Sequence, residues 1–167
     1  MAPRQRHPGT AILAASFAAG VYGSIVAAAL VAALRETGES ATRSVLSLLS
    51  TMAVFWLAHV WSQITGERIH HGRRFRSHLA REIALAEWPL VEAAFGPALL
   101  LLLGAVGILT DRTALDGALA VCGLQLLGWG FLVGRRAYGR WYEAVLSGVA
   151  NGLLGLVLVG LESAVLH

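Results

Sequence analysis

Apolar residues along this chain fall into five long blocks separated by short polar segments. The blocks cover residues 11–34, 44–65, 88–109, 113–134 and 142–165. Each is at least as long as the roughly 20 apolar residues that a membrane-spanning helix needs. The pattern predicts an all-α membrane protein in which residues 1–167 form a single bundle of five transmembrane helices. The first block is longer than the apolar region of a signal peptide, so we expect a retained helix.

The link between the second and third blocks has a pattern of its own. Phe75, Leu79 and Ile83 recur every four residues, with arginines around them. This spacing predicts a short basic helix that lies on the inner membrane surface. Its arginines would bind anionic lipid headgroups, at about 1 kcal/mol for each charge. They are Arg73, Arg74, Arg76 and Arg81.

Composition supports a membrane protein and sets its orientation. Apolar residues make up 56% of the chain and charged residues only 14%, against about one quarter charged in soluble domains. All 13 basic residues are arginine. Ten of them lie in the N-terminal segment and in the second and fourth links, which the positive-inside rule assigns to the cytoplasm. We therefore expect the N-terminus inside and the C-terminus outside. The Arg-, Ala- and Gly-rich composition favours a bacterial inner membrane, and no feature suggests a nucleic-acid partner.

Small residues line one face of the first and fifth blocks. Ser16, Gly20 and Ser24 lie four residues apart, as do Gly148 and Gly152. Such faces let helix backbones approach closely in lipid. They can pack within one bundle or between subunits, and because a small bundle has little room for an internal pathway we expect a homo-oligomer.

Two ionisable residues lie inside neighbouring blocks. His59 is in the second block and Glu92 in the third, at similar depths on antiparallel helices. A charge at the bilayer centre costs about 2.5–3.5 kcal/mol, and less nearer the surface, so a buried Glu92 should face protein or water. A His59–Glu92 pair would offset that cost. Pro97 further predicts a kink near Gly96–Pro97 that leaves a backbone carbonyl without its donor.

Other polar residues extend this pair into a hypothetical ion pathway. A homo-oligomeric channel or transporter for protons or small cations is the first hypothesis, because a His–carboxylate pair changes charge near neutral pH. Hydrogen bonds between helices are an equally good explanation of the same residues. The additional pathway candidates are Thr51, Gln63, Gln125, Asn151 and Glu162.

Two further hypotheses differ in class from transport. The chain could be a non-transporting scaffold or accessory subunit, in which His59 and Glu92 matter only for folding. It could instead be an enzyme acting on a lipid or quinone, which needs a cavity between the second and third spans. The sequence has no G-x-S-x-G, HExxH, P-loop or CxxC motif. No cofactor is predicted.

A few acids and histidines have simpler explanations. The segment TALD (113–116) resembles a capping box with Thr113 as the cap, and Glu87 favours the helix start at Pro89. Histidines among arginines in a link are usually surface residues, so no metal site is predicted. The weak candidates for one are Glu67, His70, His71 and His78.

Overall fold

The computed structural model describes residues 8–71 and 77–165, and within them every regular element is a helix. The prediction of an all-α protein is therefore confirmed for this part of the chain. The helices are α1 (Pro8–Glu36), α2 (Ala41–His71), α3 (Ser77–Ala86), α4 (Pro89–Glu92), α5 (Phe95–Ala105), α6 (Asp111–Tyr138) and α7 (Trp141–Val165).

Several of these helices are long and apolar enough to cross a membrane. Three qualify by themselves, over Ala15–Glu36, Ala41–Ile69 and Asp111–Ala137. A fourth span results if His78–Glu92 and Phe95–Ala105, which meet at 48°, are counted together. The described residues are thus compatible with a multi-pass membrane protein of three or four spans. Helix α7 is 25 residues long, and beyond Leu153 only some of its side chains are described.

The bent pair confirms the predicted kink. Helix α4 ends at Glu92 and α5 begins at Phe95. Pro97 has no N–H to donate to the carbonyl of Ala93, so the regular hydrogen-bond ladder fails there. The amide of Ala94 turns back to the carbonyl of Val91 at 3.0 Å, and the ladder resumes when Ala98 donates to Ala94 at 2.9 Å.

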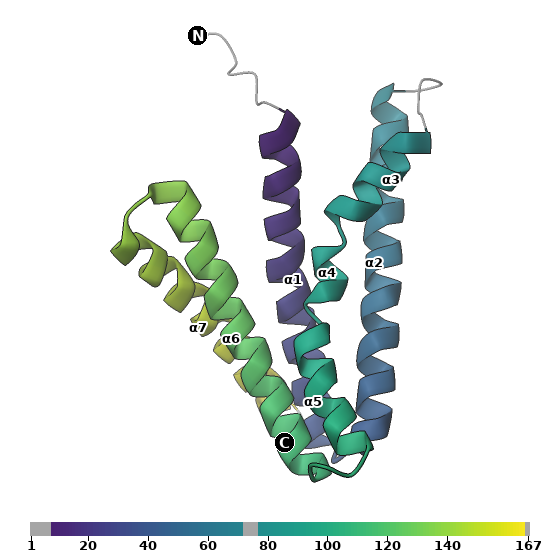
Figure 1. Ribbon diagram of the computed structural model, residues 1–167, viewed down its shortest axis with the longest axis vertical. Coiled ribbons are helices and arrows are strands. Elements are labelled where there is room, and N and C mark those ends of the chain that lie inside the picture. Colours follow the sequence, from purple (N-terminus) through teal and green to yellow (C-terminus); the bar gives the residue numbers. More distant parts are fainter. Residues whose placement is uncertain (1–7, 72–76, 166–167) are drawn as a thin grey trace.

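The helices converge at one end of the molecule and separate at the other. Figure 1 shows α1, α2 and α5 side by side, with the α6–α7 hairpin leaning away from α1 toward the end where α1 begins. The buried core occupies the convergent part and consists largely of small and aliphatic side chains. It includes Ala27, Val31, Leu48, Met52, Leu90, Leu101, Ala118 and Cys122.

Glycines allow helices to approach one another closely. A Cβ atom on Gly130 would lie 2.7 Å from the Cα of Gly148, and one on Gly134 would lie 2.6 Å from the Cα of Ala144, so α6 and α7 touch directly. On α1, a Cβ on Gly20 would lie 2.6 Å from the ring of Trp129.

The predicted small-residue faces are therefore used inside this chain. Ser24 is buried and donates to the carbonyl of Gly20 at 2.9 Å, and Ser16 is partly buried on the same helix. Gly148 and Gly152 pack against α6, where a Cβ on Gly152 would lie 2.6 Å from Leu127. These contacts account for the small residues without a second subunit, and the homo-oligomer stays a prediction.

Polar contacts join α1, α2 and α6 at the convergent end. Thr110, not Thr113, caps α6 and accepts from the amide of Thr113 at 3.2 Å. The predicted capping box was wrong because the helix begins before it. Asp116 pairs instead with Arg35 of α1, and Asp111 accepts from the amide of Ala41 at 2.9 Å.

Candidate ligand cleft

The structure does not bring His59 and Glu92 together. The His59 ring lies 5.0 Å from the Tyr22 ring of α1, measured between centroids. Glu92 is exposed at the end of α4. Among the described residues no hydrogen bond or ion pair joins the two side chains. The prediction rested on the similar depth of the two residues on antiparallel helices, which does not fix the direction in which each side chain points.

The remaining pathway candidates are distributed over the bundle. Thr51 is partly buried on α2, and Gln63 is exposed. The Gln125 amide lies beside Gly96, and its Oε1 is buried without a hydrogen-bond partner. Asn151 is partly buried between α6 and α7. Glu162 is on α7, outside the described side chains.

Among the described side chains the buried acid is Glu87, which the sequence explained only as favouring a helix start. Glu87, at the junction of α3 and α4, is only 6% exposed. Its position follows from the packing of α4 against α1, where a Cβ on Gly23 would lie 2.6 Å from the carbonyl oxygen of Leu90. The sequence predicted a buried Glu92 and a helix-start role for Glu87, whereas in the structure Glu87 is buried and Glu92 is exposed.

The basic link and the weak metal candidates are described only in part. Arg81 and His78 are exposed on α3, and Glu67 is partly buried on α2. Among the described side chains no group of three or more His, Cys, Asp or Glu could hold a metal ion. Arg73, Arg74 and Arg76, and the side chains of His70 and His71, lie outside the described residues.

A cleft with the character of a binding site lies between α1, α6 and α7. Its volume is about 810 Å³, within the range of roughly 300–1,000 Å³ typical of small-molecule sites. It lies where the α6–α7 hairpin leans away from α1 (Figure 1). The lining residues are Phe17, Ala18, Val21, Tyr22, Ile25, Val133, Arg136, Ala137, Ser147 and Asn151.

One face of α1 forms the apolar wall of this cleft. Phe17, Val21 and Ile25 recur every four residues and so stack along the helix. Eight residues separate the first from the last, a rise of about 12 Å along the axis. Tyr22 lies beside them and also contacts the ring of His59, so His59 lies directly behind this wall.

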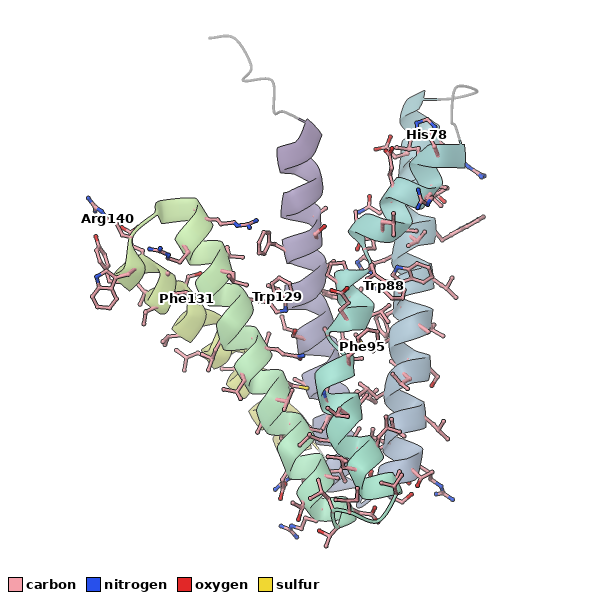
Figure 2. The ribbon with its side chains drawn as sticks, in the orientation of Figure 1. His78, Trp88, Phe95, Trp129, Phe131 and Arg140 are labelled. Atoms are coloured by element: carbon pink, nitrogen blue, oxygen red, sulfur yellow. The ribbon has the colours of Figure 1, made fainter. Side chains whose placement is uncertain are left out.

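An aromatic pair joins α1 to α6 beside the cleft. Trp129 of α6 meets Phe17 edge to face, with ring centroids 5.7 Å apart and an angle of 86°. Figure 2 shows Trp129 between α6 and α1. The guanidinium carbon of Arg136 lies 4.8 Å from the centroid of the Phe17 ring. A charge is thereby held over the apolar wall by a cation–π contact.

Polar groups occupy the opposite wall of the cleft. Arg136 lies near the end of α6, and Ser147 and Asn151 lie on the facing side of α7. Arg136 has no carboxylate partner among the described residues, although other arginines there do. The ion pairs of the described residues include Arg35–Asp116, Arg35–Glu36, Arg43–Glu39 and Arg140–Glu143.

Sequence reasoning missed Phe17, Tyr22 and Arg136 as site residues. Tyr22 was a visible signal, since it is the only tyrosine within the first apolar block. Arg136 had been counted only as one of the arginines that orient the chain. No protein-family model, curated protein or solved structure matches this chain.

Proposed function

We propose that this chain is a multi-pass membrane protein that binds a membrane-dissolved amphiphile in the cleft between α1, α6 and α7. The observation that carries the proposal is the cleft itself, with its volume of about 810 Å³ and its mostly apolar lining. A pocket of this size with a few convergent polar groups is typical of a ligand site. This hypothesis keeps the lipid or quinone ligand considered from the sequence and transfers it to other helices.

The chemistry of the walls favours a molecule with two different ends. Phe17, Val21 and Ile25 offer an apolar strip about 12 Å long, which suits an acyl or prenyl chain. Ser147 and Asn151 face it, and in a nonpolar environment such groups cost free energy unless they are hydrogen-bonded. A ligand with a polar end and an apolar chain would form hydrogen bonds with the polar wall and fill the apolar one.

The five-span topology belongs to the same proposal. In it α4 and α5 together form the third span and α7 forms the fifth, with the N-terminus in the bacterial cytoplasm. The C-terminal end of α2, helix α3, and the C-terminal end of α6 with the turn that follows it lie toward the end where α1 begins (Figure 1). These segments carry Arg68, Arg81, Arg135 and Arg140, as the positive-inside rule requires. Trp61 and Trp141 are 65% and 69% exposed in the same region, as in an aromatic belt. The cleft would then open to the inner leaflet.

Helix α3 would lie at that inner surface. Its exposed Arg81, with Arg73, Arg74 and Arg76 of the preceding link, would contact anionic headgroups. Trp56 of α2 donates its indole N–H to the carbonyl of Ala84 at 3.2 Å. This bond holds the C-terminal end of α3 against α2.

Filling the cleft tests the proposal. Val21→Trp would place an indole in the cavity, and Val54→Trp makes the same change on α2, where Val54 is 63% exposed and outside the cleft. Each protein would be purified in mild detergent, and native mass spectrometry would measure retained lipid per chain. We expect wild type and Val54→Trp to retain a lipid that Val21→Trp loses. Equal retention by all three proteins, or none by wild type, would refute the proposal.

Ion transport is a second candidate, favoured by the break between α4 and α5. Interrupted helices often mark ion sites because their free carbonyls can coordinate a cation. Glu92 ends α4, and the buried Oε1 of Gln125 has no partner beside Gly96. Flux into proteoliposomes would be compared for wild type, Glu92→Gln, Gln125→Leu and His59→Ala. The candidate requires wild-type flux that at least one substitution abolishes, and flux equal to that of empty liposomes would exclude it.

A further inference from the structure

The cleft also indicates what kind of headgroup its ligand carries. We infer that it selects a phospholipid with an anionic headgroup and that Arg136 recognises the phosphate. This inference rests on the proposed function, since it names the ligand of the same cleft. It is distinct from general attraction of lipids to the basic link, because Arg136 lies in a cavity between helices.

The first argument concerns charge. None of the residues that line the cleft is acidic, and Arg136 has no carboxylate partner among the described residues. Arg136 is exposed and lines the cleft, so its charge is available to an anion that enters there. A neutral quinone would not pair with this charge.

The second argument concerns geometry at the guanidinium. The Arg136 group lies over the Phe17 ring at 4.8 Å, and Trp129 supports that ring from the edge. Contact with a ring uses the flat face of a guanidinium and leaves its N–H edges available. Two parallel N–H donors match two oxygens of a phosphate, which makes arginine well suited to a phosphodiester.

The third argument concerns depth along the hairpin. Gly134 packs on Ala144 and Gly130 packs on Gly148, which fixes the register of α6 against α7. In this register Arg136 is level with residue 142, so Ser147 lies about 7.5 Å deeper and Asn151 about 13.5 Å deeper, at about 1.5 Å per residue. A phosphate at Arg136 would place the ester carbonyls of a glycerolipid nearer to Ser147 than to Asn151. Its acyl chain would continue along Val21 and Ile25 of α1.

The chain offers a closely matched control for this residue. Arg135 is the neighbour of Arg136 on α6 and is also exposed, but it does not line the cleft. Wild type, Arg136→Gln and Arg135→Gln would be titrated in detergent with phosphatidylglycerol and with phosphatidylcholine, and bound lipid counted by native mass spectrometry. We expect wild type and Arg135→Gln to prefer phosphatidylglycerol by about tenfold or more, as charge-assisted hydrogen bonds imply. Arg136→Gln should lose that preference.

Further arms separate this inference from the proposed function and from a folding defect. Arg136→Lys keeps the charge without the paired donors and should retain part of the preference, which a misfolded protein would not. Identical selectivity of Arg136→Gln and Arg135→Gln would overturn the headgroup assignment, while lipid loss in Val21→Trp would still support the cleft. Unchanged lipid retention in Val21→Trp would overturn both. Displacement by excess soluble glycerol 3-phosphate would identify a free phosphate ester as the ligand and overturn the lipid.

Discussion

The contact between α6 and α7 gives the sharpest test of the packing, because two nearby glycines differ only in their surroundings. A Cβ on Gly130 would lie 2.7 Å from both the Cα of Gly148 and the carbonyl oxygen of Ser147. A Cβ on Gly128 would meet nothing within 4 Å. Gly130→Ala and Gly128→Ala therefore make the same chemical change on one helix, with and without a backbone obstacle.

The magnitude follows from how far the helices must move. Ordinary contacts of a Cβ lie at 3.4–4 Å, so the helices must separate by at least about 0.7 Å at Gly130. Backbone atoms cannot rotate away, and overpacking of this kind costs about 1–3 kcal/mol. The gain in helix propensity is about 1 kcal/mol for either substitution and cancels in the comparison. Gly130→Ala should therefore be less stable than Gly128→Ala by about 2 kcal/mol.

Cys122 provides the assay. It is the only cysteine of the chain and is 0% exposed, so a thiol reagent reaches it only when the bundle opens. When closing is faster than labelling, the labelling rate follows the population of the open state. A difference of about 2 kcal/mol makes labelling of Gly130→Ala about thirtyfold faster than that of Gly128→Ala. Equal rates would show that α6 and α7 do not meet at Gly130. The α6–α7 register from which the depths of Ser147 and Asn151 were derived would then also be wrong.

Three other substitutions test separate parts of the structure with the same thiol assay. Trp129→Ala should destabilise the bundle by about 1–3 kcal/mol, and it should also reduce lipid retention because Phe17 loses its support; unchanged retention would contradict the aromatic pair. Asp111→Ala should lower the stability of the bundle by about 1 kcal/mol, because it removes the hydrogen bond to the amide of Ala41. Asp116→Asn should lower it by about 0.5 kcal/mol or less, because the pair with Arg35 is screened by solvent. The reverse order would contradict this account of the convergent end. Trp56→Phe should cost about 1 kcal/mol by removing the donor to Ala84, and no change would mean that α3 does not dock on α2.

The helices themselves were predictable from the sequence, because a run of about 20 apolar residues identifies a helix that can span a membrane. The blocks at 11–34 and 113–134 correspond to Pro8–Glu36 and Asp111–Tyr138, with differences only at the ends. The kink was also predictable, since Pro97 affects its own helix. The second helix extends to His71, beyond the expected end at residue 65, because apolar length marks the lipid boundary and not the end of a helix.

The site was not predictable, because it depends on which faces meet. The expected His59–Glu92 pair rested on the similar depth of the two residues, and depth does not fix the direction in which each side chain points. The cleft forms because the α6–α7 hairpin contacts α1 at one end of the molecule and leans away from it at the other. The sequence of a single helix does not specify this arrangement. The spacing of Gly130 and Gly134 was visible in the sequence. It did not show that α7 is the helix that packs against them.

The polar contacts of Asp111 and Asp116 have a mechanical consequence. They fasten α6 to α1 and α2 at one end, while the opposite end of the α6–α7 hairpin carries the cleft (Figure 1). Helix α6 has 28 residues, which makes it a lever about 42 Å long. A tilt of about 5° at the fastened end would move the far end by about 4 Å, roughly the width of an acyl chain. Contacts at the end of the protein remote from the cleft would thus control the width of the cleft's opening.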